Sequence, residues 1–316
     1  MLVLYLLLPK LVGTEKALKL IAHANLALLI VAALLEATAL TGYANLFRHI
    51  LRVLDIRLSL GTMVKIVLAG LAMSHIFSAG GAAGWVVSYN ALRRKGVPHG
   101  LVFVAVAAQN FFNYIVLWAF FLLAMVYLII SGRLSPFAYT AATVLILFFL
   151  WLTGYGLYLY HHRAKMRRRV TQIAHLINRM SRRERITPEH IDGWLDSLFA
   201  GMRRMTTHRG ATRTSLVYSM AYWVFDLSCL YLVFFAFGVG TRITLPHLVI
   251  SYVVGYAVGT LAPTPGGLGA IEGLLIAMFV GFGVPSAETV AVVLTYRLIN
   301  FWLPIPPGLI SYVTLR

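Results

Sequence analysis

Four ionisable side chains fall inside long apolar segments of this sequence, where a charge is costly. They are Glu36, Asp226, Glu272 and Arg297. Ionisable groups held in hydrocarbon are rare, pair with one another and mark sites of binding or transport. A guanidinium stays charged and matches a phosphate with paired hydrogen bonds, so Arg297 is the best candidate to hold an anionic group. Glu272 and Asp226 could neutralise Arg297 when the site is empty, or contact a cationic headgroup.

These residue types also leave structural alternatives open. Glu272 and Arg297 could form a buried ion pair that stabilises the backbone break. If the substrate displaces that pair on binding, the two residues would serve both the structure and the binding site. Glu36 could be a functional acid, or it could lie near a helix end, close to water.

A segment rich in proline and glycine, residues 263–273, surrounds Glu272 and separates two apolar runs. Pro removes an amide donor and Gly raises the entropic cost of order, so a helix cannot continue through this segment. In a bilayer, irregular backbone is tolerated only where protein buries it or where it lines a wet cavity. We therefore expect a site whose loop amides contact an anion, the alternative being an ordinary loop at the membrane surface. The expected break residues are Pro263 and Pro265, and the expected amide donors are Gly266, Gly267 and Gly269.

The composition indicates a polytopic helical membrane protein. Of the residues, 60% are hydrophobic and only 12% are charged, and the mean hydropathy is +0.81. The apolar runs are continuous and do not alternate with polar residues, which argues against a barrel. The single cysteine, Cys229, allows neither an internal disulfide nor a cysteine-based metal cluster, and we expect no metal and no cofactor.

The net charge of +17 has a strongly uneven distribution along the chain. Of the 27 Lys and Arg residues, 13 lie in 161–213, and only 3 follow this stretch. Basic residues clustered beside membrane spans are the positive-inside pattern and also suit anionic inner-leaflet lipids. We therefore expect no nucleic-acid partner, and we expect 161–213 to form basic amphipathic helices on the cytoplasmic face.

The chain is expected to form one all-α transmembrane domain, 1–316, with about six to eight spans. Residues 1–160 form its first half and 214–316 its second. We expect a broken, re-entrant hairpin in each half, over 66–90 and over 246–282. The first would break at Gly80 and Gly81, although a single helix rich in small residues and packed closely on a neighbour is the alternative.

The two halves share a short internal repeat. Gly96-Val97-Pro98 recurs as Gly283-Val284-Pro285, and at the same offset Asn113 matches Asn300. Basic residues precede the first turn, whereas none lies close to the second. By the positive-inside rule the two turns face opposite sides, which predicts an inverted repeat of the kind found in alternating-access transporters, unless the short match is chance. Asn113 and Asn300 are accordingly candidate substrate contacts.

The segment from Leu261 through Glu272, followed by Tyr296-Arg297, resembles the lysylphosphatidylglycerol synthase/flippase transmembrane-region family. This family forms the membrane half of the multiple peptide resistance factor and includes stand-alone relatives. The resemblance extends over nearly the whole chain, since residues 80–100 also resemble the motif of that family's first half. It implies movement of lipids between leaflets. The chain lacks the family's soluble aminoacyltransferase domain and should not synthesise lysylphosphatidylglycerol.

Our leading hypothesis is therefore a flippase for a phospholipid or lipid-linked anionic headgroup in the cytoplasmic membrane of a prokaryote, and not an enzyme. A membrane-embedded lipid-modifying transferase is the first alternative, although no Asp-x-Asp pair or Ser/His/Asp set supports it. A non-catalytic partner that docks a separate lipid synthase through 161–213 is the second. A homodimer is a further expectation.

Overall fold

A computed structural model describes residues 20–77, 82–131, 164–172, 188–207, 209–262 and 264–315, with isolated positions between 143 and 162. All regular elements within these residues are helical, which confirms the predicted all-α class. In this part of the chain, four helices are long and apolar enough to cross a membrane, and three apolar helices are shorter. Gly80, Gly81 and Pro263 lie outside the described residues.

The first half contains four described helices before residue 131. These are α3 (Leu26–Val53), α4 (Leu60–Ile76), α5 (Ala82–Arg94) and α6 (His99–Ile130). Side-chain caps start two of them: Asn25 accepts the Leu28 amide at 3.2 Å, and Ser59 accepts the Thr62 amide at 3.2 Å. Caps of this kind satisfy amides that have no partner within the helix.

The second half begins after an amphipathic helix and ends in an irregular span. The elements are α9 (Pro188–Thr207), α10 (Arg209–Ala236), a 3-10 turn (Gly240–Arg242), α11 (Leu245–Leu261), a 3-10 turn (Pro265–Gly267), α12 (Ala270–Gly281), α13 (Ser286–Arg297), a π-helical turn (Leu298–Trp302) and α14 (Ile305–Thr314). The helix α10 starts five residues before residue 214, where the second half was expected to begin, because helical hydrogen bonding continues through the basic residues that precede the apolar run.

The same order of elements occurs in both halves. Two short helices, a Gly-Val-Pro turn and a long helical segment follow one another in each, and in the second half a glycine-rich break separates the two short helices. The two turns also share a conformation. Gly96 and Gly283 have φ of 81° and 89°. The Val97 amide donates a hydrogen bond to the Leu92 carbonyl, and the Val284 amide donates one to the Phe279 carbonyl. This is a Schellman cap, in which a glycine with positive φ ends the helix and proline prevents its continuation.

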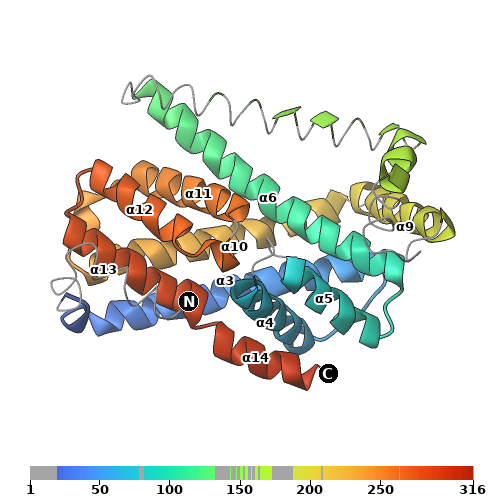
Figure 1. The fold of residues 1–316 in the computed structure, drawn as a ribbon, viewed down its shortest axis with the longest axis horizontal. Coiled ribbons are helices and arrows are strands. Elements are labelled where there is room, and N and C mark those ends of the chain that lie inside the picture. The colour runs from blue at the N-terminus through green and yellow to red at the C-terminus, as the bar shows by residue number, and fades with distance from the viewer. Residues whose placement is uncertain are drawn as a thin grey trace.

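The two halves pack through corresponding helices. The helices α3 and α10 lie side by side and run in opposite directions, α3 from left to right and α10 from right to left in Figure 1. The helix α4 packs on α14, and α11 packs on α6. The final span therefore contacts α4 of the first half, and α6 of the first half contacts α11 of the second.

Glycine allows the contact between α4 and α14 to be close. A Cβ placed on Gly308 would lie 2.4 Å from the Leu68 carbonyl oxygen and 2.6 Å from the Ala72 Cβ. Small residues at such positions let helix backbones approach in membranes, where dispersion and not the hydrophobic effect drives association.

We expect Gly308→Ala to destabilise the protein by about 1–3 kcal/mol, because the new methyl group must displace the α4 backbone. Thermal unfolding in detergent measures the change. Gly61→Ala is the matched control: Gly61 lies in α4 with nothing within 4 Å of its would-be Cβ, so alanine should be neutral or stabilise through helix propensity. Equal melting temperatures for both variants would contradict the close approach.

Candidate functional site

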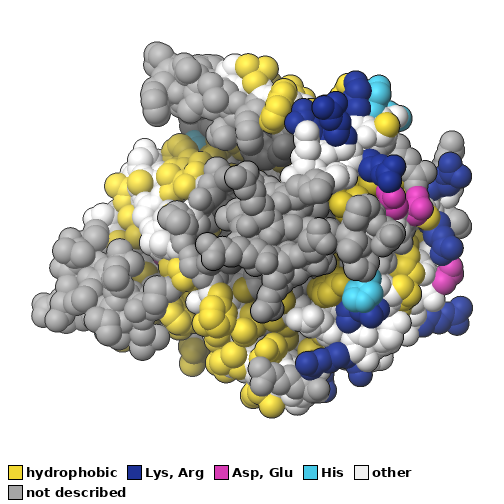
Figure 2. Space-filling view, turned by 45° about the vertical axis from the view of Figure 1, so that its right-hand side comes forward, with side chains coloured by type: hydrophobic (Ala, Val, Ile, Leu, Met, Phe, Trp, Pro, Cys, Tyr) yellow, Lys and Arg dark blue, Asp and Glu magenta, His cyan; other side chains and the backbone are white. Residues whose placement is uncertain are grey.

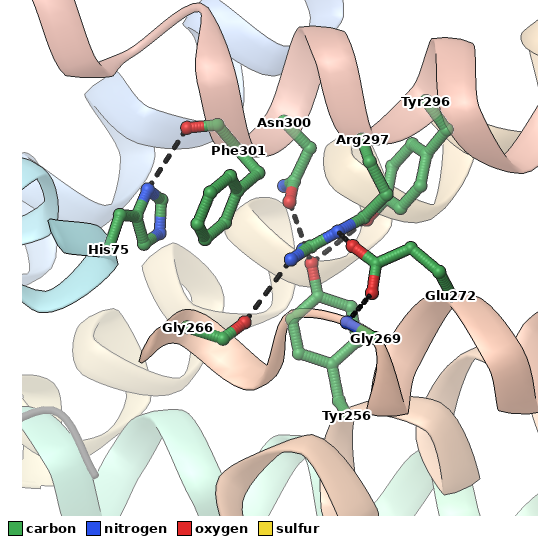
Figure 3. Close-up of polar contacts among 9 residues, drawn as sticks. All are labelled: His75, Tyr256, Gly266, Gly269, Glu272, Tyr296, Arg297, Asn300 and Phe301. Carbon is green, nitrogen blue, oxygen red and sulfur yellow. Dashed lines mark hydrogen bonds and ion pairs between the residues drawn. The ribbon is translucent and has the colours of Figure 1, made fainter. Parts of the chain in front are cut away.

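The backbone break between α11 and α12 forms one wall of the site (Figure 3). Gly266, Gly267 and Gly269 adopt φ of 54°, 68° and 84°, a region that other residues rarely enter. Gly266 has a second requirement, since a Cβ there would lie 2.2 Å from the Phe301 ring. The break leaves the Gly266 carbonyl and the Gly269 amide outside the helical hydrogen-bond ladder, where they can bind side chains.

Arg297 occupies these freed groups together with Glu272. Its Nε donates to Glu272 Oε1 at 2.6 Å and its Nη2 donates to the Gly266 carbonyl at 3.2 Å. The guanidinium also lies 4.4 Å from the centroid of the Phe301 ring. The Arg297 side chain is 2% exposed and the Glu272 side chain 1%. A charged pair this deep requires full hydrogen bonding to offset its desolvation.

The local sequence explains where Glu272 lies. It is in the first turn of α12, where its Oε2 accepts the Gly269 amide at 2.7 Å, as in a capping box. The positive end of the helix dipole also favours a carboxylate there. Glu272 therefore has two roles, since one oxygen caps α12 and the other holds Arg297.

A second polar cluster surrounds Asp226 on α10. Its Oδ2 accepts from the Tyr252 hydroxyl at 2.6 Å, and its Oδ1 accepts from the Tyr296 hydroxyl at 2.7 Å and from Asn300 Nδ2 at 3.1 Å. The Tyr256 hydroxyl lies 3.1 Å from both Asp226 Oδ2 and Asn300 Oδ1 and 2.9 Å from the Tyr296 hydroxyl, and its one proton can serve one of these oxygens at a time.

Glu36 joins this second cluster from α3. Asn300 Nδ2 donates to Glu36 Oε1 at 3.2 Å as well as to Asp226. The two clusters are neighbours because Tyr296, Arg297 and Asn300 lie within little more than one turn at the junction of α13 and the π-helical turn. A π-turn changes the direction of side chains that follow it and often occurs at functional sites.

The structure brings most of the predicted site residues together. Gly266, Gly269, Glu272 and Arg297 form one cluster, and Glu36, Asp226 and Asn300 form the other. Gly267 is buried within the break, where a Cβ would lie 3.0 Å from the Gly259 Cα. Pro265 opens the 3-10 turn.

Asn113 lies apart from these contacts. It is buried on α6, and its carbonyl accepts the Trp223 indole N–H at 2.8 Å. None of the hydrogen bonds described for it reaches Arg297 or Asp226. The repeat that pairs Asn113 with Asn300 therefore does not place them in one cluster.

Several residues of the site were missed from sequence. Tyr252, Tyr256 and Tyr296 surround Asp226. His75 is near the other cluster: its Nδ1 lies 3.0 Å from the Phe301 carbonyl oxygen, and its ring stacks on the Phe301 ring. A signal was available for the tyrosines, since Tyr252 and Tyr256 recur at helical spacing inside an apolar run. Among the described residues, no group of His, Cys, Asp and Glu could hold a metal ion.

The sequence is similar to a known family and to several archaeal membrane proteins. The family model described as "Lysylphosphatidylglycerol synthase TM region" matches residues 1–308. A UPF0104 membrane protein of Pyrococcus horikoshii is 24% identical over 303 residues, which cover 92% of this chain and 88% of the relative. One from Methanocaldococcus jannaschii is 22% identical over 308 residues, covering 96% and 90%. One from Methanothermobacter thermautotrophicus is 31% identical over 159 residues, covering 48% and 46%.

A double-mutant cycle measures the buried pair. Glu272→Gln or Arg297→Met alone should cost about 3–5 kcal/mol, because each leaves an uncompensated buried charge. The double variant removes both charges and should lose much less than the sum of the two. Denaturant unfolding in detergent gives the values.

The matched control is Arg204→Met, which breaks the exposed pair of Arg204 with Asp55 and should be close to neutral. Additive losses at Glu272 and Arg297 would show that the two charges do not stabilise each other.

Proposed function

The chain belongs to the lysylphosphatidylglycerol synthase transmembrane-region family, and we propose that it is a lipid translocator. Its substrate would be a phospholipid or lipid-linked molecule with an anionic headgroup, moved between leaflets of a prokaryotic cytoplasmic membrane. The proposal involves no covalent chemistry on the lipid and no cofactor.

The observation that carries this proposal is the buried Arg297 guanidinium at a backbone break. A headgroup crossing hydrocarbon must exchange its hydration for fixed polar contacts. Arg297 already has such contacts in Glu272 and the Gly266 carbonyl, and a phosphate could replace both. Glu272 would keep its bond from the Gly269 amide, so that its carboxylate would not be left without a donor. The ion pair between Arg297 and Glu272 would thus close the empty site, and substrate binding would break it.

The arrangement of the two halves supports an alternating-access mechanism. The antiparallel α3 and α10, the two Schellman turns and the mutual packing of the broken hairpins are what an inverted repeat with re-entrant hairpins would produce. The Asp226 cluster lies where the two halves meet, since α3 supplies Glu36 and the second half supplies the rest. The Arg297 cluster is next to the first half through His75 on α4, which bonds the Phe301 carbonyl. Rocking of one half against the other would expose both clusters to each leaflet in turn.

The charge distribution suggests the orientation. Figure 2 shows the Lys and Arg side chains in its right-hand half, and exposed basic residues lie at the end of α5, in residues 164–169 and on α9. By the positive-inside rule this end would face the cytoplasm and contact anionic lipids. The same basic surface could receive a separate synthase.

Replacing Arg297 by Lys tests the phosphate role. Lysine keeps the charge but lacks the planar pair of donors, so we expect about 10- to 100-fold slower translocation, which corresponds to one or two charged hydrogen bonds. The assay is dithionite quenching of headgroup-labelled anionic phospholipid in proteoliposomes that contain the purified chain.

Arg204→Lys is the matched control at an exposed ion pair, and its rate should not change. Wild-type rates for a well-folded Arg297→Lys would contradict the role of Arg297. Transport that appears only when a co-purified soluble enzyme is added would favour the docking partner, and a modified lipid product would favour the transferase.

A further inference from the structure

Carboxylates outnumber cations in the buried part of the site. Glu36, Asp226, Glu272 and Arg297 are each no more than 2% exposed, and they are the buried members of Asp, Glu, Lys and Arg among the described residues. Glu272 is matched by Arg297. Glu36 and Asp226 have no guanidinium or ammonium partner among their described contacts, and two adjacent ionised carboxylates without a cation are unfavourable in a low-dielectric interior.

The donors around Asp226 are sufficient for it to remain ionised. Tyr252, Tyr296 and Asn300 donate to its two oxygens at 2.6, 2.7 and 3.1 Å, and the Tyr256 hydroxyl lies in reach as a fourth donor. A carboxylate that accepts several hydrogen bonds is stabilised in its charged form.

Glu36 has a different environment. Its Oε1 accepts only the Asn300 amide, at 3.2 Å, and its Oε2 is buried without a hydrogen-bond partner. Asn300 Nδ2 donates to both carboxyl groups, to Glu36 Oε1 at 3.2 Å and to Asp226 Oδ1 at 3.1 Å, so the two acids are neighbours across one amide nitrogen. A proton on Glu36 would resolve this arrangement. It would remove one of the two neighbouring negative charges, and it would turn the unpartnered Oε2 from an acceptor into a hydrogen-bond donor.

We propose that Glu36 and Asp226 form a proton-binding site with Glu36 as the protonated member, and that release of this proton is coupled to opening of the lipid site. On release, the O–H bond at Glu36 Oε2 breaks and the proton passes to water, leaving two carboxylates that repel each other across the α3–α10 contact. No oxidant or other reactant is required. Only the coupling rests on the proposed lipid transport.

The surrounding groups determine what else could titrate. The ionisable and polar side chains around the pair are Tyr222 and Cys229 on α10, Tyr252 and Tyr256 on α11, Tyr296 on α13, and Asn300 in the π-helical turn, and Arg297 is bonded to Glu272 and the Gly266 carbonyl instead. The tyrosines and the cysteine are neutral at physiological pH, so the proton is exchanged by the two acids.

A physical link joins this site to the lipid site. The Tyr256 hydroxyl has Asp226, Asn300 and the Tyr296 hydroxyl within hydrogen-bond distance, and Tyr296, Arg297 and Asn300 lie within one short segment. Proton release from Glu36 alters the partners of Asn300, and with them the position of the segment that carries Arg297.

Infrared spectroscopy of the reconstituted full chain tests the proton site without any added substrate. At neutral pH we expect a protonated-carboxyl band that shifts in D2O, shifts again when glutamate is labelled with 13C, and is lost in Glu36→Gln. Glu288→Gln, a carboxylate outside both clusters, should keep the band. Absence of the band in the wild type, or its survival in a folded Glu36→Gln variant, would overturn the assignment. The isotope label identifies a glutamate even if that variant does not fold.

Coupling is measured separately by imposing pH gradients of opposite direction across proteoliposomes. The translocation rate of the wild type should change with the direction of the gradient, and Glu36→Gln should lose that response. A wild-type rate that ignores the gradient would overturn the coupling. If no lipid moves at all, the proposed function fails, while the infrared result still decides whether Glu36 binds a proton.

Discussion

The cost of keeping a guanidinium away from water governs the architecture around Arg297. A lone arginine in an apolar interior would be unstable, so the structure must supply acceptors where a regular helix has none to offer. The break between α11 and α12 supplies them, because it frees the Gly266 carbonyl and places Glu272 at a helix start. Three glycines with positive φ make that backbone path possible.

The last span contributes a residue to each of the two polar clusters and so holds them next to each other. Arg297 ends α13, and the π-helical turn that follows presents Asn300 to Glu36 and Asp226. One short segment thus contacts α3, α10, α11 and the break before α12. A small displacement of this segment would change the partners of a guanidinium and of two carboxylates together, and discrete rearrangements of this kind underlie two-state mechanisms.

The fold was largely predictable because the membrane limits the possibilities. A chain with continuous apolar runs and few charges crosses a membrane as helices, because each backbone polar group must then be hydrogen-bonded within its own segment. The Gly-Val-Pro sequence ends a helix with the same turn at both of its occurrences. The boundaries were less accurate. The helix α4 begins at Leu60, ahead of the segment 66–90, and α10 begins at Arg209, ahead of residue 214, because a helix continues as long as its backbone can hydrogen-bond.

The sequence by itself determined the helical class, the break at Pro265 to Gly269 and the identity of the costly charges, because composition, proline and glycine chemistry and desolvation act locally. Only the tertiary structure decided how those charges are paired. Arg297 and Glu272 are 25 residues apart and Glu36 and Asn300 are 264 apart, and nothing in local spacing distinguishes these pairs from Arg297 with Asp226. Packing of α12 on α13 pairs Glu272 with Arg297, and packing of α3 on α10 brings Glu36 to Asn300. Packing of α6 on α10 leaves Asn113 beside Trp223, although the repeat paired it with Asn300.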